Sequence, residues 1–294
     1  MSHLSLTLNR KPEWLKKRLD PRAMAPVRAL MRGQALHTVC EEAHCPNIGE
    51  CWGRRTATFM ILGDRCTRAC AFCAVRTGRP TGLDTEEPGR VAEAAAALGL
   101  RHVVVTSVNR DDLDDGGAAI FAAVVAALHG QGQSVEVLTP DFQGNLAAID
   151  RVADAGPEIY GHNVETVPRL YHAMRPQAAY RRSLDLLAWV KAVRPELLTK
   201  SGLMVGVGET PDEVVAVLRD LRAVGCDVVT LGQYLAPGAA YHPVVEYVTP
   251  QRFEGYREAG EAMGFLAVAS APFVRSSYNA DAVWERLRRS HGRQ

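Results

Sequence analysis

The sequence has no long apolar run and no excess of charge of either sign. None of its apolar stretches approaches the roughly 18 residues that a membrane-spanning helix needs, so we expect no membrane segment. The chain holds 34 Lys and Arg against 33 Asp and Glu, without the basic excess typical of proteins that bind nucleic acid. Residues 1–20 mix basic side chains with Glu13 and lack the apolar segment of a secretory signal. We therefore expect a cytoplasmic protein that binds neither nucleic acid nor membrane.

Internal repeats and low-complexity linkers are also missing, apart from alanine-rich helix faces. An apolar content of 47% over 294 residues supports a substantial core, so no structural metal is needed merely to hold the fold together. The seven cysteines are an odd number, and six of them fall between residues 40 and 73. Such clustering favours metal binding in a reducing compartment over a framework of disulfides.

Three of these cysteines lie within eight residues. Cys66, Cys70 and Cys73 have the spacing C-x3-C-x2-C and follow an apolar run at residues 58–62 that predicts a buried strand. Thiolates this close can converge on one iron–sulfur cluster, whereas a closed zinc site needs four ligands. Three cysteines leave one iron without a protein ligand, and a substrate or cofactor can bind there. The alternative is that three core cysteines are close by chance.

A second triplet precedes the first. Cys40, Cys45 and Cys51 have the spacing C-x4-C-x5-C. Pro46 and Gly49 lie among them and predict a turning loop rather than a helix. Two triplets so close in sequence indicate two clusters.

The remaining candidate ligands have simpler interpretations. His37 and His44 lie near the second triplet, and we expect hydrogen-bonding neighbours there rather than ligands. Cys226 is far in sequence from both triplets, and we expect it in the core, where free cysteines are common.

After Cys73 the chain alternates between β-prone apolar runs and helical patterns. With the run at 58–62, this alternation predicts a parallel sheet with crossover helices. The expected strands are 58–62, 103–106, 135–138, 158–163, 199–205 and 227–231. The expected helices are 13–19, 26–32, 89–98, 117–128, 146–155, 183–193, 212–224 and 251–263, followed by an apolar run at 265–270 and a polar tail.

The predicted fold class is α/β, a partial TIM-like (β/α)6 barrel with cluster-bearing extensions at both ends. We expect an N-terminal extension over residues 1–55, the barrel over 56–270 and a C-terminal tail over 271–294. In such a barrel the active site forms just past the carboxyl ends of the strands. Polar residues or glycines occur at each of these positions: 106–112, 139–141, 163–166, 202–209 and 232–234.

The first triplet, with Phe72 before its last cysteine, resembles the signature of the radical S-adenosylmethionine (SAM) superfamily. Residues 202–209 match that superfamily's G-x-I-x-G-x-x-E pattern, with Met204 in place of Ile. The two triplets in this order, the flanking Pro-Asn-Ile-Gly-Glu-Cys-Trp and the Arg-Ser-Ser-Tyr-x-Ala tail at 275–280 resemble the lipoyl synthase family. The likeness covers nearly all of residues 36–280. Small departures are Ala271 where Gly is expected and Ala-Pro-Gly at 236–238.

The resemblance implies sulfur insertion at carbons 6 and 8 of an octanoyl group held on a lysine of a lipoyl carrier domain. Those carbons are unactivated, so cofactors must supply the reactivity. By the resemblance, the first triplet holds a 4Fe-4S cluster whose open iron binds SAM. The second triplet holds an auxiliary 4Fe-4S cluster that serves as the sulfur donor. Its fourth ligand is a serine of the tail, expected to be Ser276, although spacing does not distinguish it from Ser277.

Position and chemistry suggest contacts to SAM. Asn163 and Glu165 suit the ribose hydroxyls, Phe72 the adenine, and Ser107 and Asn109 the methionyl amine.

The resemblance also implies partners. These are octanoylated carrier domains (from the E2 subunits of 2-oxoacid dehydrogenases or the glycine cleavage H protein), an electron donor such as ferredoxin or flavodoxin, and a carrier protein that rebuilds the auxiliary cluster. Because carrier domains tend to be acidic, Arg76, Arg79 and Arg110 are candidates for docking. The alternative is that these arginines pair with local carboxylates or with SAM.

Two other function classes remain to be compared. A biotin synthase-like sulfur-inserting enzyme would lack the N-terminal triplet and the Arg-Ser-Ser-Tyr tail. A non-enzymatic electron carrier would need closed clusters, and a zinc module would need four ligands, whereas each site here has three cysteines.

Overall fold

The structure, a computed structural model, describes residues 11–17 and 20–290. Its centre is an eight-stranded sheet in the order β1-β2-β5-β6-β7-β8-β9-β10. Every neighbouring pair from β2 to β10 is parallel, and only β1 runs antiparallel, against β2. The strands are β1 (His37–Thr38), β2 (Thr58–Ile61), β5 (His102–Ser107), β6 (Ser134–Leu138), β7 (Ile159–Gly161), β8 (Leu198–Val205), β9 (Val228–Gln233) and β10 (Ala267–Ser270). A separate pair, β3 (Arg65–Cys66) with β4 (Arg76–Thr77), follows β2.

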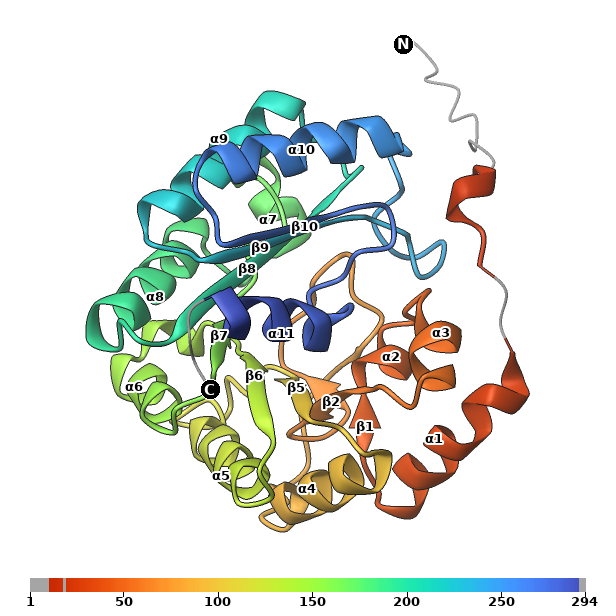
Figure 1. Cartoon of the computed structure of the whole chain (residues 1–294), viewed down its shortest axis with the longest axis vertical. Helices are drawn as coiled ribbons and strands as arrows, with labels where there is room; N and C mark the ends of the chain where they lie inside the picture. Colours follow the sequence, from red (N-terminus) through yellow and green to blue (C-terminus); the bar gives the residue numbers. More distant parts are fainter. Residues whose placement is uncertain (1–10, 18–19, 291–294) are drawn as a thin grey trace.

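Helices surround the curved sheet as an outer layer (Figure 1). They are α4 (Glu87–Leu98), α5 (Ala118–His129), α6 (Leu146–Asp154), α8 (Tyr180–Val193), α9 (Pro211–Ala223) and α10 (Pro250–Ala262), with the short α7 (Tyr171–Met174) and the 3-10 turns η2 (Phe142–Gly144) and η3 (Pro168–Leu170) between them. The predicted α/β fold with a mostly parallel sheet is therefore confirmed. The apolar run at 265–270 forms β10, which extends the sheet beyond the six predicted strands. Among the described helices, none is long and apolar enough to cross a bilayer.

The strands form because their residues are buried on both faces. β2 and β9 have no exposed residue at all, as expected for strands covered by helices on one side and barrel interior on the other. Caps fix the helix ends. Thr210 and Glu213 form a reciprocal capping box at the start of α9, and Gly99 ends α4 in the left-handed conformation.

The N-terminal extension differs from prediction at α1. Helix α1 runs over Pro21–Gly33, so it begins before Pro26, and Pro26 lies inside it. Asp20 caps the helix by accepting hydrogen bonds from the backbone N–H groups of the first turn, and Pro21 occupies the position where a missing N–H costs least. The helix expected at 13–19 is reduced to the 3-10 turn η1 (Glu13–Leu15), while residues 18–19 lie outside the described part of the chain.

The second cysteine triplet is more helical than predicted. Cys40 lies on α2 (Val39–Glu42) and Cys51 on α3 (Ile48–Gly53), and only Cys45 lies in the loop between them. The expected turning loop is therefore wrong for two of the three thiols. Short helices form because Thr38 accepts a hydrogen bond from the Glu41 N–H, and because Pro46 precedes α3 and interrupts no helical hydrogen bond.

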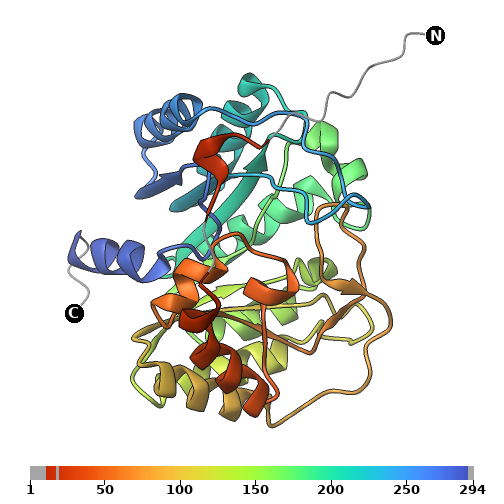
Figure 2. The same ribbon diagram turned by 90° about the vertical axis from the view of Figure 1, so that its right-hand side faces the viewer.

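The polar tail contains a helix that the sequence analysis missed. Helix α11 (Ala280–Ser290) buries Trp284 and Leu287. Their apolar partners come from the amino-terminal halves of the last four parallel strands: Ile159, Leu198, Val228 and Ala267. The helix therefore closes the amino end of the sheet. Figure 2 shows α11 at one end of the molecule and the long loops after β2 at the opposite end.

We expect Trp284→Ala to destabilise the fold by about 3 kcal/mol, the usual cost of removing a buried large aromatic side chain. Trp284 is 8% exposed, and its ring stacks on His102 with a centroid distance of 5.8 Å. Urea unfolding of the cluster-free protein measures the change. Asp281→Ala, on the exposed face of α11, is the matched control and should stay within about 0.5 kcal/mol of the parent. Equal effects of the two substitutions would contradict the proposed closure by α11.

Candidate functional site

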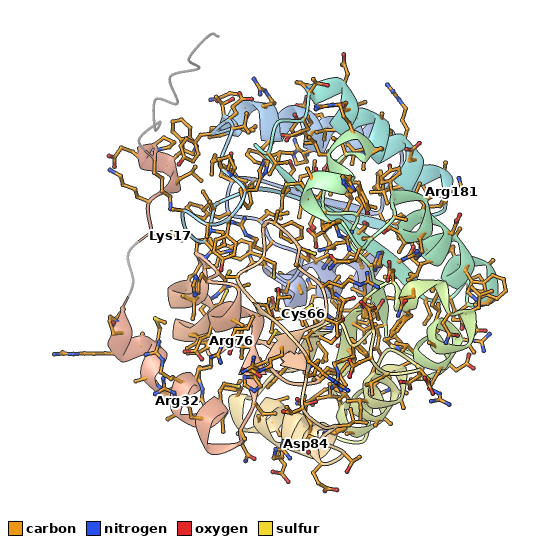
Figure 3. The ribbon with its side chains drawn as sticks, turned by 180° about the vertical axis from the view of Figure 1, so that it is seen from behind. Lys17, Arg32, Cys66, Arg76, Asp84 and Arg181 are labelled. Atoms are coloured by element: carbon orange, nitrogen blue, oxygen red, sulfur yellow. The ribbon has the colours of Figure 1, made fainter. Side chains whose placement is uncertain are left out.

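The first cysteine triplet lies over the carboxyl end of the sheet. Cys66 ends β3, and Cys70 and Cys73 follow in the next loop. Figure 3 shows this face, with Cys66 near its middle. All three thiols are free and partly buried. The pKa of Cys73 is raised to about 12, mainly by burial and in smaller part by the neighbouring Cys70 and Cys66. The three sulfur atoms are therefore close enough to interact, and iron binding must displace their protons.

Each thiol of this triplet already faces a hydrogen-bond donor. The backbone N–H groups of Arg68 and Asn109 donate to Cys66 Sγ over 3.4 and 3.3 Å. The N–H of Val75 lowers the pKa of Cys73, and the charge of Arg175 lowers that of Cys70, although burial raises both. Donors of this kind stabilise a thiolate or a cluster sulfur, so these residues fit an iron–sulfur cluster.

Polar side chains without partners surround the triplet. Ser107 Oγ and Asn109 Oδ1 are buried and have no hydrogen-bond partner among the described residues. Since buried polar atoms are nearly always satisfied, these two atoms fit a polar ligand that binds at the carboxyl end of β5. Both residues are the ones that position and chemistry suggest for the methionyl amine.

Asn163 and Glu165 follow β7 as expected. Asn163 Nδ2 donates to Glu165 Oε1 over 3.0 Å and to Ser276 Oγ over 2.7 Å. Glu165 has a φ of +65°, a left-handed conformation that costs about 1–3 kcal/mol in a residue with a side chain and often marks functional sites. Burial raises the pKa of Glu165, and Arg175 and Asn163 oppose that rise.

Phe72 contributes an apolar wall to the site. It packs against a small cluster of buried side chains beside the ends of β8 and β9, formed by Met174, Val207 and Tyr234. An apolar surface next to unpartnered polar groups is typical of pockets for cofactors.

Glu209, the last residue of the glycine-rich pattern, has a structural role. Its carboxylate accepts hydrogen bonds from the N–H groups of Gly206 and Val207 over 2.6 and 2.9 Å. Gly206 has a φ of +94°, and a Cβ there would lie 2.2 Å from Gln233 Nε2. The pattern therefore shapes the loop after β8.

The second triplet gathers beside the amino end of β2. The pKa of Cys40 is raised to about 12, mainly by burial and in smaller part by Cys45 and Cys51, so these sulfur atoms are also close together. Trp52 is fully buried, and its Nε1 has no hydrogen-bond partner among the described residues. The same nitrogen lowers the pKa of Cys40, so it faces the sulfur. An unpaired donor at a buried thiol fits a second cluster.

No three His, Cys, Asp or Glu side chains in the described residues converge on the position of a single metal ion. That arrangement is unlike a mononuclear zinc site, where all ligands meet at one ion. In a four-iron cluster each thiolate binds a different iron, so the thiols need not meet at one point.

The C-terminal tail runs between the two triplets. Asn47 Nδ2 donates to the Phe273 carbonyl over 2.7 Å, and Tyr278 donates to Glu50 over 2.8 Å. Gly232 permits this path, because a Cβ there would lie 2.0 Å from the carbonyl oxygen of Val274. Arg275 is partly buried, within reach of both Cys45 and Glu165; desolvation lowers its pKa, and those two groups oppose the change.

The two adjacent serines of the tail point to different sites. Ser276 Oγ accepts its hydrogen bond from Asn163, near the first triplet. Ser277 Oγ accepts one from Thr58 Oγ1 over 2.7 Å, and the backbone N–H of Thr58 lowers the pKa of Cys40. On the far side, Tyr278 interacts with Cys51. Of the two serines, Ser277 therefore lies on the side of the second triplet.

The arginines proposed for docking have separate environments. Arg110 is 4% exposed and donates to Asp112 over 2.9 Å, so it is not available at the surface, and the docking hypothesis for it is wrong. The side chain of Arg76 is 64% exposed, with an ion pair to Asp64, and Arg79 is exposed.

Two other candidates, His37 and Cys226, behave as predicted. His37 pairs with Glu42 over 3.4 Å, and Cys226 is fully buried in the core. The sequence analysis missed Arg175, which donates to the carbonyl oxygens of Asn163 and Val164. No motif marks it, because its position depends on the turn after α7.

The fold and the three-cysteine site at the carboxyl end of the sheet define a radical SAM enzyme. The model of the radical SAM superfamily matches residues 60–221. Two solved structures share the fold: methylornithine synthase (TM-score 0.52, 14% identity, 94% of this chain and 90% of that one), and Streptococcus suis SuiB bound to S-adenosylmethionine (TM-score 0.54, 10% identity, 72% and 49%). Members of this superfamily use a 4Fe-4S cluster and SAM.

More similar relatives narrow the assignment. The chain is 56% identical over 282 residues to the lipoyl synthase of Rubrobacter xylanophilus, with 95% of this chain and 88% of that protein covered. It is 58% identical over 273 residues to the lipoyl synthase of Caldanaerobacter subterraneus, with 92% and 96% covered. The chain belongs to the lipoyl synthase family.

Proposed function

We propose that the chain converts a protein-bound octanoyl group to a lipoyl group by inserting sulfur at carbons 6 and 8. The observation that best supports this is the pair of three-thiol sites, one at each end of β2, with the C-terminal tail between them. A single electron-transfer cluster would need one site of four thiolates. Two sites that each lack a fourth thiolate suit two different tasks, SAM cleavage at one and sulfur donation at the other.

At the first site, Cys66, Cys70 and Cys73 would hold the 4Fe-4S cluster. Bound there, cluster and SAM supply a one-electron cleavage whose radical product removes hydrogen from unactivated carbon. Ser107 and Asn109 would accept from and orient the methionyl amine, since both have unsatisfied oxygen atoms. Asn163 and Glu165 would hold the ribose hydroxyls, and Phe72 would pack on the adenine.

At the second site, Cys40, Cys45 and Cys51 would hold the auxiliary 4Fe-4S cluster, which we treat as the sulfur-donating substrate. The sequence predicts Ser276 as fourth ligand, but its hydrogen bond to Asn163 favours a place at the first site. We propose Ser277 instead, because its hydrogen-bond partner Thr58 and the next residue, Tyr278, both interact with this triplet. Arg275 would separate the two sites and keep their anionic groups apart.

The substrate would be an octanoylated carrier domain. A ferredoxin or flavodoxin would deliver electrons, and a cluster carrier would rebuild the donor cluster after each turnover. The cysteines are free, which fits a reducing cytoplasm. The division into an extension (1–55), a barrel (56–270) and a tail (271–294) stays a prediction, with α11 added to the tail.

Incubation of the reconstituted protein with octanoylated carrier peptide, SAM and a strong reductant tests the function. Mass spectrometry should show a product heavier by two sulfur atoms with its hydrogen count unchanged, because the reductant keeps the product as the dithiol, and metal analysis should give about eight irons per chain. Bound zinc, or SAM cleavage with an unchanged peptide, would refute the proposal.

We also expect binding of an acidic carrier domain to weaken with salt, because exposed charges are screened over about 8 Å at physiological ionic strength. Of the arginines predicted for docking, Arg76 and Arg79 are exposed. Reversing both to Glu should weaken carrier binding about three- to tenfold, measured by calorimetry at low and high salt. Arg181→Glu is the matched control, since Arg181 is 79% exposed but lies at the rim, away from Cys66 (Figure 3). An affinity that ignores both salt and the Arg76 and Arg79 reversals would exclude electrostatic docking there.

A further inference from the structure

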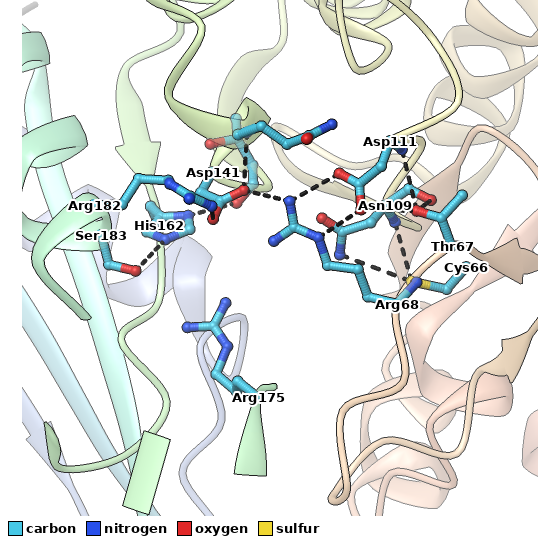
Figure 4. Close-up of polar contacts among 12 residues, drawn as sticks. Cys66, Thr67, Arg68, Asn109, Asp111, Asp141, His162, Arg175, Arg182 and Ser183 are labelled. Atoms are coloured by element: carbon cyan, nitrogen blue, oxygen red, sulfur yellow. Dashed lines mark hydrogen bonds and ion pairs between the residues drawn. The ribbon is translucent and has the colours of Figure 1, made fainter. Parts of the chain in front are cut away.

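Arg68 lies inside the first cysteine triplet, yet its side chain points into the protein. It is 4% exposed. Its guanidinium donates twice to Asp111, over 2.7 and 2.8 Å, and once to Asp141, over 2.6 Å (Figure 4). An arginine between two cysteine ligands would ordinarily be expected at the surface, since burying a charge is costly unless it is paired.

The first partner, Asp111, ties two loops together. The Asp111 N–H donates to Thr67 Oγ1 over 3.1 Å. The same Thr67 hydroxyl lies within hydrogen-bond distance of the Asp111 carboxylate, also at 3.1 Å. The Thr67 N–H in turn donates to the carbonyl of Asn109 over 3.0 Å. These hydrogen bonds connect the loop after β5 to the cysteine loop, and the two hydrogen bonds from the Arg68 guanidinium to Asp111 strengthen the connection.

The second partner, Asp141, anchors Arg68 to the scaffold. Its side chain is fully buried and also accepts from the Gln143 N–H over 3.0 Å and from Arg182 over 3.1 Å. Burial alone would raise the pKa of Asp141, but the hydrogen bond and charge of Arg68 hold it well below its usual range. The Asp141 carboxylate therefore stays charged, and the Arg68 guanidinium is held between two carboxylates, those of Asp111 and Asp141.

The consequence appears at Cys66. Three N–H groups point at its sulfur: the backbone N–H of Arg68 at 3.4 Å, the backbone N–H of Asn109 at 3.3 Å and the side-chain amide of Asn109 at 3.8 Å. Two of the three N–H groups belong to Asn109, which is positioned by the hydrogen bonds between the Thr67 and Asp111 loops. The third belongs to Arg68 itself. Hydrogen bonds to cluster sulfur atoms are among the factors that set the reduction potential.

We propose that Arg68 is a positioning residue that, through Asp111 and Asp141, holds three N–H donors on Cys66 and so raises the reduction potential of the cluster bound there. The inference rests on the proposed role of Cys66 as a ligand. Donors on the sulfur stabilise the added electron, so the network makes the first cluster easier to reduce.

Arg68→Ala should make the potential of the first cluster more negative. We expect a change of about tenfold in the reduction equilibrium, which equals about 59 mV for one electron. Potentiometry of the holoprotein measures it, followed through the part of the spectroscopic signal that changes when SAM is added. Arg68→Lys keeps the charge but not the planar fork, and should give an intermediate shift.

A second readout needs no cluster. In the cluster-free protein, alkylation of Cys66 should be about tenfold faster in Arg68→Ala, because the loop that covers its sulfur loosens, while alkylation of Cys45 should not change. Asp111→Asn preserves the shape of the side chain and serves if Arg68→Ala fails to fold. It should show the same direction in both measurements.

Two controls separate positioning from general loosening. Lys200→Met breaks a pair of similar burial, Lys200 with Glu136 at 2.7 Å, away from the cysteines. Arg182→Ala removes the half-exposed partner of Asp141. Both should leave the potential and the alkylation of Cys66 unchanged. An unaltered potential in Arg68→Ala and Asp111→Asn, or an equal shift in Lys200→Met, would overturn the inference. If Cys66→Ala itself kept a full first cluster, the proposed function would fail instead.

Discussion

A Cys45→Ala protein should still cleave SAM but release no lipoyl product, whereas Cys70→Ala should lose both activities. Cys70 belongs to the site with the N–H donors and the unpartnered Ser107 and Asn109 oxygens, so its loss removes radical formation. Cys45 belongs to the other triplet, the proposed site of the sulfur-donating cluster, so its loss removes only the sulfur donor. We expect at least a hundredfold loss in each affected step, in line with the largest effects of removing metal-site residues.

Chromatography of methionine and deoxyadenosine measures cleavage, and mass spectrometry of the carrier peptide measures sulfur insertion. Each variant should also fall from about eight to about four irons per chain. Cys226→Ala is the matched control, because Cys226 is fully buried in the core and contacts neither triplet. It should keep both activities. Lipoyl product from Cys45→Ala would contradict the assignment of the second triplet as sulfur donor.

The sequence predicts the parallel sheet well because its strands are short β-prone runs that are almost entirely buried. The predicted run at 199–205 and the observed β8 (Leu198–Val205) differ by one residue. Strand order follows from crossover connections, so it places Ser107, Asn163 and the first triplet at one end of the sheet. What the sequence does not predict depends on contacts between distant segments.

Helix α11 illustrates the limit. Its apolar residues, Val283, Trp284 and Leu287, are too few among charged neighbours to stand out from a polar tail, and they become a helix face only when the open amino end of the sheet receives them. The same holds for Arg175 and Arg68. From the sequence alone an arginine is expected at the surface. Only the fold shows that Arg68 is buried against carboxylate oxygens and that the partly buried Arg175 donates to carbonyl oxygens.

The tail shows the limit at the level of single side chains. Spacing cannot distinguish Ser276 from Ser277, because their orientation is set by a turn in which the Tyr278 N–H donates to the Arg275 carbonyl over 3.0 Å. In that turn the two hydroxyls have different partners, since Asn163 donates to Ser276 and Thr58 donates to Ser277. The hydrogen-bond partners in the fold therefore change the proposed ligand from Ser276 to Ser277.

Replacing Ser277 by Cys should trap the auxiliary cluster. A neutral hydroxyl is a poor ligand and an alkoxide is costly to form near neutral pH, so a serine–iron bond is weak, and ligand deprotonation makes it dependent on pH. A thiolate binds iron far more strongly. A cluster that gives up its sulfur needs one iron that leaves easily, and a fourth thiolate opposes that loss. We expect Ser277→Cys to keep about eight irons, to cleave SAM at the parent rate, and to form lipoyl product at least tenfold more slowly.

The adjacent serine provides the matched control. Ser276→Cys carries the same chemical change one residue away, beside Asn163 rather than Thr58. It should leave the stability of the auxiliary cluster to iron chelators unchanged and should alter SAM binding, because Asn163 is a proposed ribose contact. In Ser277→Cys, by contrast, the auxiliary cluster should resist chelators and persist after turnover, followed by iron release and by mass spectrometry of the stalled peptide. Full lipoyl formation by Ser277→Cys together with a trapped cluster in Ser276→Cys would return the ligand to Ser276, and parent behaviour in both variants would remove the tail from the site.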